Sequence, residues 1–323
     1  MKLLALTFGD ENCASTRYRL LQYLPLMEAE GITLDHTPAK SFDQWNALRD
    51  YDAVILQKTL LSRRKVRRLA KRSKRLLYDA DDRIWLRPGK PYSWLTRLRL
   101  SLRVRQICRY ADCCMAANGI IAADLRQHGA DPVVIPMALD GNIWFPPEKR
   151  EGPLTIGWTG SPVSLQYLEP IRPAMVATQR AHPEVRWQIH CGKDPAWGDL
   201  KYEHIPFTPG NEPATVRQFD IGLLPLPAGE FAQGKSPIKA LQYFASGVAL
   251  IHAPVGATVE LTCNNTLGSP ASLFEDWKEA MVKLINSEEK HHALANRART
   301  HFLKTHDLYV VFERLRAQIS GDK

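Results

Sequence analysis

The sequence predicts an α/β protein built from two parallel, doubly wound sheets. Short apolar runs alternate with helix-like segments in the first half, a charged, proline-rich stretch follows at residues 146–153, and the alternation then starts again. Strands that alternate with helices are typical of parallel sheets with helices on both faces. We therefore expect two Rossmann-like domains, 1–148 and 149–305, facing each other across a cleft. A last segment, 306–323, is expected to pack back on the first domain.

The elements of the first domain follow from short apolar runs and from helical periods. Gly31 is expected to close the first helix, because glycine is common just after a helix end. The predicted strands are Lys2–Phe8, Ile32–His36, Ala53–Gln57, Leu76–Asp79, Cys113–Ala117 and Val133–Pro136. The predicted helices are Arg17–Glu30, Arg63–Arg75 and a short one that ends in Asp124–His128.

The second domain repeats the pattern. Its predicted strands are Thr155–Trp158, Arg186–Cys191, Phe219–Leu224 and Val248–His252. Its predicted helices are Leu165–Ala181, Ile238–Ser246, Glu275–Asn286, Ser287–His301 and, in the last segment, Leu308–Ile319. Ligands of such sheets bind at the carboxyl ends of the strands. Functional residues are therefore expected in the loops that directly follow strands.

The composition limits the class of protein. No apolar run reaches the roughly 18 residues that a membrane-spanning helix needs. The apolar start, Leu3–Phe8, ends at Gly9 and is too short for a signal peptide. The six cysteines form no C-x-x-C pair, which argues against zinc-ribbon and thioredoxin-like sites. We therefore expect a cytoplasmic protein with reduced thiols.

The net charge of +9 is concentrated in the first half, where basic residues crowd 63–75 and arginines recur over 97–109. Such a field attracts phosphates, nucleic acid or anionic lipid. The mixture of Trp94 with leucines and arginines is typical of an interfacial helix, although the alternation of Leu and Arg is closer to a period of two. The sequence thus predicts peripheral contact with an anionic inner membrane face through Arg63–Arg109; the alternative is a solvated helix face.

The segment Gly229–Ser236 matches the P-loop pattern G-x-x-x-x-G-K-[ST]. Prolines at 225 and 227 before the loop, and Pro237 after it, argue against a P-loop ATPase, and Val248–His252 carries no Walker-B-like Asp. A loop that leads into a helix N-terminus is still a favourable anion site. Pro237 suits a first helical turn.

Other candidate binding residues also follow predicted strands. Lys235 and Lys239 add positive charge beside the predicted helix start, so a diphosphate is the expected ligand there; the alternative is a capped helix with solvated lysines. Gly160 and Ser161 follow the first strand of the second domain, where glycine lets a ligand approach the backbone. Lys193 follows the next strand and either reaches a phosphate or lies on plain surface. An ordinary turn is the alternative for Gly160 and Ser161.

The first domain offers carboxylates and arginines at equivalent places. Asp79, Asp81 and Asp82 end a predicted strand, and close carboxylates raise one another's pKa, which suits acid-base chemistry or a metal. They could equally cap a helix or pair with nearby arginines. After the first strand and Gly9, Arg17 and Arg19 open the first helix, where they either bind a phosphate or an acidic acceptor or lie on the surface.

Taken together, these segments resemble the glycosyltransferase family 4 group of GT-B enzymes. The most specific part is 234–251, Gly-Lys-Ser-Pro-Ile-Lys-Ala-Leu-Gln-Tyr-Phe-Ala-Ser-Gly-Val-Ala-Leu-Ile, which follows Phe219–Pro227. Residues 156–162 resemble the opening of the family's C-terminal domain, and Ile121–Asp140 resembles the end of its N-terminal domain. The two glutamates that the family carries near its donor helix correspond here to Gly234 and Gln242. Its N-domain histidine corresponds to Asp81.

The resemblance implies a hexosyltransferase-like enzyme that transfers a sugar from a nucleotide diphosphate sugar to a glycan or lipid-linked acceptor. Transfer is expected to retain the anomeric configuration and to need no metal or cofactor. Asp81 and Asp82 are the expected catalytic residues, and Gly9, Arg17 and Arg19 are expected to meet the acceptor or a phosphate. The expected donor-binding residues are Gly160, Ser161, Lys193, Gly234, Lys235, Ser236, Pro237, Lys239 and Gln242.

Two alternatives come from other classes of protein. A P-loop nucleotide hydrolase would use Gly229–Ser236 and would require magnesium. A non-catalytic nucleic-acid-binding protein would use the basic residues of the first half, but the sequence lacks any RNA-binding signature and the second half would have no role. We therefore expect no nucleic acid partner.

Overall fold

The computed structural model describes every residue except Glu151, Pro209, Asp322 and Lys323. The parts of the predicted linker and of the predicted segment 306–323 that fall on these residues lie outside the described chain. The described chain forms two compact units. Unit 1 contains Met1–Ala138, Gly229–Ser236 and the last helix, and unit 2 contains Leu139–Ala228 and Pro237–Asp307. The proline-rich stretch near residue 148 is therefore part of unit 2, and the short segment 229–236 belongs to unit 1.

Unit 1 is built on a six-stranded parallel sheet with the order β2-β1-β3-β4-β5-β6. The central strands β3 and β4 are buried along their whole length, as expected where both faces of a parallel sheet are covered. Strand order switches between β1 and β3, the place where such sheets bind ligands. The strands are β1 (Lys2–Thr7), β2 (Thr33–Pro38), β3 (Ala53–Gln57), β4 (Leu76–Ala80), β5 (Cys113–Ala116) and β6 (Val133–Val134).

The helices of unit 1 depart from expectation at two places. The predicted helix Arg17–Glu30 is split, because Pro25 lacks the N–H that a continuous helix would use and instead lies in the first turn of a new helix. Residues Trp94–Tyr110 form a long helix despite their near-alternating pattern. The helices are α1 (Ala14–Arg19), α2 (Leu24–Ala29), α3 (Arg63–Arg72), α4 (Trp94–Tyr110), α5 (Gly119–Gln127), α8 (Glu230–Gln233) and α13 (Leu308–Ser320), with 3-10 turns at Leu21–Tyr23 and Ala47–Asp50.

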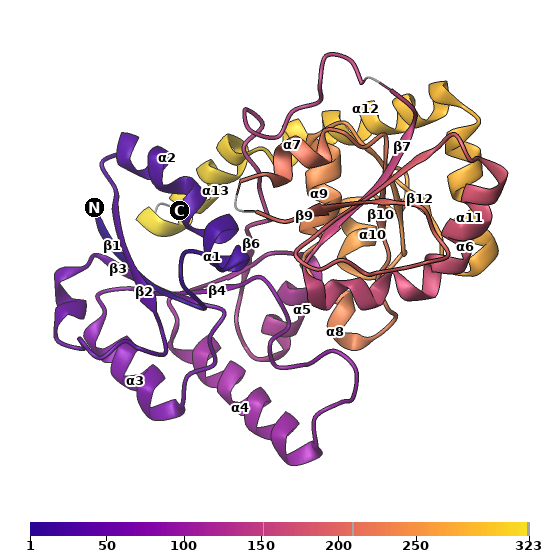
Figure 1. The fold of residues 1–323 in the computed structure, drawn as a ribbon. Coiled ribbons are helices and arrows are strands. Elements are labelled where there is room, and N and C mark those ends of the chain that lie inside the picture. The colour runs from indigo at the N-terminus through magenta and orange to yellow at the C-terminus, as the bar shows by residue number, and fades with distance from the viewer. Residues whose placement is uncertain (151, 209, 322–323) are drawn as a thin grey trace. The chain divides into compact units, whose positions relative to one another are not determined.

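The last helix, α13, completes the core of unit 1 (yellow in Figure 1). Phe312 stacks on Tyr23, with ring centroids 6.1 Å apart. Arg75 Nη1 also donates a hydrogen bond of 2.7 Å to the carbonyl of Ile319 near the end of the helix. The C-terminal helix is thus part of the same hydrophobic core as the first strands of the chain.

Unit 2 is a second six-stranded parallel sheet, with the order β12-β11-β10-β7-β8-β9. Its first strand, β7, is central; the next two strands lie on one side and the last three on the other, which is the Rossmann order. The strands are β7 (Thr155–Gly160), β8 (Arg186–Cys191), β9 (Glu203–Pro206), β10 (Ile221–Leu224), β11 (Ala249–His252) and β12 (Ser269–Pro270). The predicted fold class, two Rossmann-like doubly wound domains, is confirmed.

The helices of unit 2 pack around a core of tryptophans and aliphatic residues that includes Trp158, Trp187 and Trp277. The predicted helix Leu165–Ala181 begins as two 3-10 turns, Pro162–Tyr167 and Glu169–Ile171. The α-helices are α6 (Arg172–Ala181), α7 (Glu212–Val216), α9 (Ile238–Ala245), α10 (Ala257–Leu261), α11 (Phe274–Ile285) and α12 (Glu288–Thr305). Among the described residues, no helix is both long and apolar enough to cross a bilayer.

Candidate functional site

A cluster of buried charges lies at the carboxyl edge of the sheet of unit 1. Lys58 directly follows β3, and Asp81 and Asp82 directly follow β4. Lys58 Nζ lies 2.5 Å from a carboxylate oxygen of Asp82 and 3.4 Å from both oxygens of Asp81. It also donates a 3.0 Å hydrogen bond to Ser15 Oγ, in helix α1. The two predicted catalytic carboxylates therefore share one lysine.

The backbone of Lys58 is held in an unusual conformation. Its φ angle is +43°, in the left-handed region that non-glycine residues rarely adopt. The lysine N–H donates a 2.7 Å hydrogen bond to the carbonyl of Asp79, and the ammonium lies 5.2 Å from the centroid of the Phe8 ring. Backbone strain of this kind persists where surrounding contacts fix it, and it concentrates at functional sites.

The pKa values in this cluster follow from burial and from the mutual distances. Burial raises the pKa of the Asp82 carboxyl, the neighbouring charge of Asp81 raises it further, and Lys58 opposes both effects. Burial lowers the pKa of Lys58, but the two carboxylates outweigh it and raise the pKa overall. Lys58 is therefore held as a cation, and Asp82 is the carboxyl of the pair that accepts a proton more readily than an exposed aspartate does.

Segment 229–236 adds to this cluster within unit 1. Ser236 Oγ donates a 2.7 Å hydrogen bond to the carbonyl of Asp81, and Asn118 Nδ2 donates one of 3.2 Å to the carbonyl of Gly234. A side chain at Gly234 would collide with Arg83, so only glycine fits there. The predicted donor residues Gly234 and Ser236 thus lie beside a predicted catalytic aspartate.

Lys235 is a second cation near these carboxylates. Its side chain is half-buried. Burial lowers the pKa of Lys235, with Asp82 raising it and Lys58 lowering it further. The pKa of Lys235 therefore depends on the same Asp82 carboxylate that contacts Lys58. The partial desolvation of Lys235 would strengthen its attraction for an incoming anion.

The match to a P-loop does not have the structure of one. A phosphate-binding loop runs from a strand directly into a helix and presents successive backbone N–H groups. Here residues Glu230–Gln233 form the separate short helix α8, and helix α9 begins only at Ile238, after Pro237. Gly234 is held by Asn118. The P-loop alternative is therefore not supported.

The two predicted arginines of helix α1 differ in role. Arg19 is buried, forms a bidentate ion pair with Asp79, and donates to the carbonyls of Ile135 and Pro136. Arg19 is therefore engaged within unit 1, and its burial does not support the prediction that it meets an acceptor or phosphate. Arg17 differs, because its buried Nε has no hydrogen-bond acceptor among the described residues.

Gly9 is fixed by its neighbours after β1. Its carbonyl accepts hydrogen bonds from the hydroxyls of Thr7 (2.7 Å) and Thr16 (3.2 Å). A side chain there would come within 2.8 Å of Cys13 Cβ. Gly9 follows β1 and Lys58 follows β3, so both lie where the strand order of unit 1 switches. In the described chain, no three His, Cys, Asp or Glu side chains are arranged to hold a metal ion.

In unit 2, the predicted donor residues lie at the carboxyl edge of its sheet. Gly160 ends β7, and a side chain there would press on Trp158 and on Lys239. Lys239 Nζ lies 5.8 Å from the centroid of the Trp158 ring. The Ser161 hydroxyl is 3.0 Å from that of Ser164, and Lys193 is exposed just after β8. A glycine with cations from two elements is an arrangement that suits a diphosphate.

Gln242, the residue at the place of the family's ribose-binding glutamate, is different. It lies on helix α9 and is only 2% exposed. Its side chain presents almost no surface to a ligand in this structure, so the predicted contact with ribose is not supported. The same helix is anchored by Tyr243, whose hydroxyl accepts from the Thr159 N–H (3.3 Å) and donates to the Leu223 carbonyl (3.2 Å).

Sequence reasoning missed Lys58, although the cluster depends on it. The one available signal was its place directly after the correctly predicted strand Ala53–Gln57. Its left-handed φ angle and its carboxylate partners, 23 and 24 positions away, become visible only in the structure.

Comparison with known proteins extends the description. Neither a protein-family model nor a curated protein matches the sequence. Solved structures do match over the whole chain. Sucrose-phosphate synthase from Thermosynechococcus elongatus has a TM-score of 0.72 at 11% identity, with 100% of this chain and 99% of that chain covered. Anabaena HepE in complex with UDP has a TM-score of 0.71 at 14% identity, with 99% and 100% covered.

A third match is the lipopolysaccharide outer core galactosyltransferase WaaB, with a TM-score of 0.64, 12% identity and 100% of both chains covered. At these identities the likeness shows the fold. The chain therefore has the GT-B fold of two Rossmann-like domains that these proteins share.

Proposed function

We propose that this chain is a glycosyltransferase of the family 4 kind, which moves a sugar from a nucleoside diphosphate sugar to a glycan or lipid-linked acceptor. The observation that carries the proposal is the likeness to glycosyltransferase folds over the whole chain; one of those proteins, Anabaena HepE, was solved with UDP-glucose. A nucleic-acid-binding protein would leave unit 2 without a role.

The proposed chemistry assigns roles to groups already described. Lys235, Lys193 and Lys239 would stabilise the negative charge that develops on the leaving diphosphate, without a metal ion. Asp81 or Asp82 would contact the acceptor hydroxyl or the donor sugar. Lys58 holds both carboxylates in place, and Arg17 carries an unused buried donor that suits an anionic acceptor group. Retention at the anomeric carbon is part of the proposal.

Substitution of Lys235 tests the donor site. A charge-assisted contact contributes roughly 1.5–3 kcal/mol, or about 10- to 150-fold in affinity. Lys235→Ala should therefore weaken binding of the preferred nucleoside diphosphate by that factor in calorimetric titrations, with and without EDTA. Lys201→Ala, an exposed lysine of unit 2, is the matched control. Unchanged affinity in Lys235→Ala, or binding that disappears with EDTA, would reject the assignment.

Helix α4 supports a peripheral contact with anionic membranes. Trp94, Leu95, Leu98 and Leu102 are 72%, 60%, 52% and 50% exposed, and their spacing places them on one face of the helix. Arginines surround this face along the helix. Exposed large apolar side chains flanked by arginine are typical of a helix that lies in a lipid interface.

Vesicle co-sedimentation tests this contact. Binding to anionic vesicles should weaken with salt and be lost in the variant Leu98→Ser/Leu102→Ser, because insertion needs the apolar face as well as charge. Charge reversal at Arg64 and Arg67 of helix α3, whose exposed face is basic without large apolar side chains, is the control and should have a smaller effect. Equal binding by the serine variant and the parent would mean that the exposed face of helix α4 is a solvated face and not a membrane contact.

A further inference from the structure

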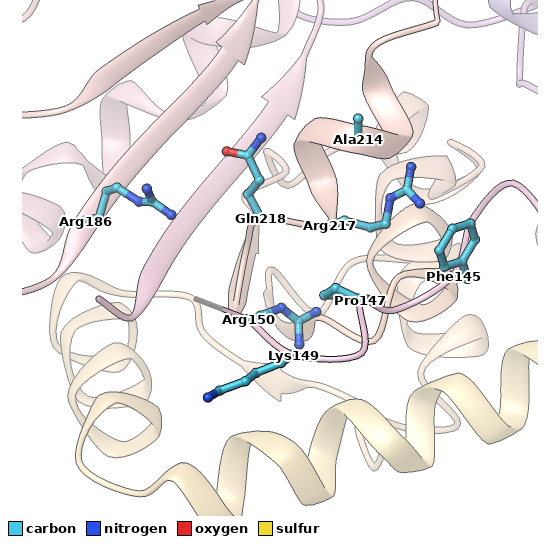
Figure 2. A pocket seen from close by; sticks show the side chains of 8 residues that line it. All are labelled: Phe145, Pro147, Lys149, Arg150, Arg186, Ala214, Arg217 and Gln218. Carbon is cyan, nitrogen blue, oxygen red and sulfur yellow. The ribbon is translucent and has the colours of Figure 1, made fainter. Parts of the chain in front are cut away.

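A basic hollow lies at the amino edge of the sheet of unit 2, apart from the sites described above. A hollow of about 560 Å³ opens there, and Figure 2 shows the side chains that surround it. They come from strand β8, from helix α7 and the segment after it, and from the stretch that leads into β7. The aromatic, basic and amide residues of the lining are Phe145, Lys149, Arg150, Arg186, Arg217 and Gln218.

Chain positions separate this hollow from the donor loops of unit 2. Arg186 is the first residue of β8, and Arg217 precedes β10. Residues before parallel strands lie at the opposite edge of the sheet from residues after them. Gly160 and Lys193 follow β7 and β8, so they lie at the other edge. A ligand in this hollow would therefore not occupy the proposed donor site of unit 2.

Three of the four cations of the hollow are not neutralised by the described chain. Lys149, Arg186 and Arg217 form no ion pair with any described carboxylate. The Nε atoms of the two arginines donate to Thr155 Oγ1 (3.0 Å) and to the Pro213 carbonyl (3.2 Å). Their terminal nitrogens have no acceptor among the described residues and so can donate to a ligand.

Arg150 adds to the positive potential of the hollow and also holds its own chain segment in place. One terminal nitrogen donates to the carbonyls of Ser246 (2.9 Å) and Gly247 (2.8 Å). Its Nε is buried without a hydrogen bond and lies 3.6 Å from Asp220. Burial lowers the pKa of Arg150, and Asp220 offsets part of that effect. A desolvated guanidinium attracts an anion more strongly than an exposed one.

A neighbouring hollow differs from this one in the charges of its lining. It measures about 620 Å³ and shares Lys149 and Arg150, but carboxylates also line it: Glu148, Asp220 and Glu288. Its charges are balanced within the protein. The described lining of the first hollow contains no carboxylate, so Lys149, Arg186 and Arg217 can pair with an anionic ligand.

The shape and chemistry of the hollow indicate the class of ligand. The Arg217 guanidinium lies 4.2 Å from the centroid of the Phe145 ring, which holds its planar fork in one orientation. Guanidinium groups recognise phosphate oxygens through paired hydrogen bonds. A volume of this size suits a small molecule. We propose that this hollow binds a small phosphomonoester, as free phosphate or as a phosphorylated metabolite, separately from the nucleotide sugar.

Calorimetric titration of the full chain tests the proposal. Inorganic phosphate and glycerol 3-phosphate should each bind saturably, with and without saturating nucleoside diphosphate, and the probe that binds more tightly identifies the source. Arg186→Gln/Arg217→Gln should weaken both by about tenfold or more, because two charge-assisted contacts are lost. Arg172→Gln is the matched control, since that arginine of unit 2 already lies near Glu169 and Asp199.

The outcomes separate this site from the donor site. Lys235→Ala should bind phosphate as the parent does. Loss of phosphate binding in Lys235→Ala but not in Arg186→Gln/Arg217→Gln would overturn the proposal, and so would absence of saturable binding by the parent. If the double variant fails to fold, Lys149→Gln, at an exposed position, should still show weakened phosphate binding. Failure of the donor-site test would leave this result unaffected.

Discussion

The charge cluster of unit 1 and the basic hollow of unit 2 differ in whether their cations have carboxylate partners. In unit 1, Arg19 is buried against Asp79, and Lys58 lies between two aspartates at 2.5 and 3.4 Å. In unit 2, Arg186 and Arg217 line a hollow with no described carboxylate partner. The first region is close to neutral without a ligand, whereas the second is not.

This difference separates stability from binding. A buried cation with a buried partner supports the fold, because loss of either charge leaves the other unpaired in a poorly solvated place. A cation without a partner contributes little to folding and is available to an external anion. Substitutions in the two regions should therefore affect different measurements, and three experiments can break or sharpen the contrast.

The largest effect is expected at the Arg19–Asp79 pair. Arg19→Met leaves the buried Asp79 carboxylate without its cation, which should lower the free energy of unfolding by about 3–5 kcal/mol. Urea unfolding measures this change. Arg17→Met, on the same helix, is the control and should have a much smaller effect, since Arg17 forms no ion pair with a described carboxylate.

A double variant distinguishes pairing from packing at the same position. Arg19→Met/Asp79→Leu removes both charges and keeps apolar volume, so it should recover most of the lost stability. If the double variant is as unstable as the sum of the single variants, the pair does not act as a unit. In that case Arg19 would act chiefly through its bonds to the carbonyls of Ile135 and Pro136.

A smaller, pH-dependent effect is expected at Lys58. Burial and the charge of Asp81 raise the pKa of Asp82, and Lys58 counteracts them. Lys58→Met should therefore raise this pKa further. A carboxyl whose folded pKa exceeds its unfolded value, about 3.9 for aspartate, contributes stability below that value and loses it as the pH rises through the folded pKa.

The stability difference between the parent and Lys58→Met should follow this sign. It should be roughly 1–3 kcal/mol near pH 7, where a buried carboxylate loses its partner, and should shrink towards about pH 4 as the Asp82 carboxyl becomes protonated. Denaturant unfolding across this range measures it, with Lys58→Arg as the control that keeps the charge. A difference that does not change with pH would mean that Lys58 contributes only by packing.

The fold could be predicted from the sequence because its central strands are fully buried apolar runs. β3 and β8 begin and end at the predicted residues. The edge strand β9 was missed, since its residues are half-buried or exposed and include Glu203 and His204. Helix α4 could not be predicted firmly, because its leucines alternate with arginines at a period close to two and several of them are exposed. Hydrophobic patterns in a sequence reveal elements that are buried, so elements at sheet edges and on the surface are harder to predict.

The site was only partly predictable, because charge pairing depends on residues far apart in the chain. Arg19 and Asp79 are 60 positions apart, so nothing local revealed that this arginine is already paired. Arg186 and Arg217 meet at one hollow only because β8 and β10 both flank β7 in the sheet. The sequence locates loops after strands, but it does not show which of their charges are neutralised.

The smallest effect is expected at the hollow of unit 2 and is the most direct check of the contrast. Arg186→Gln/Arg217→Gln removes two cations without described carboxylate partners, so the free energy of unfolding should stay within about 0.5 kcal/mol of the parent. At low salt the variant should be equal or slightly more stable, because repulsion among Lys149, Arg150 and these arginines is relieved, and added salt should remove that gain. Phosphate should raise the melting temperature of the parent, since a ligand of the folded state stabilises it by mass action, and should raise that of the variant much less. Thermal unfolding at two salt concentrations, with and without phosphate, measures all three quantities. A large loss of stability without phosphate would show that these arginines support the fold as Arg19 does, and the two regions would then not differ in kind.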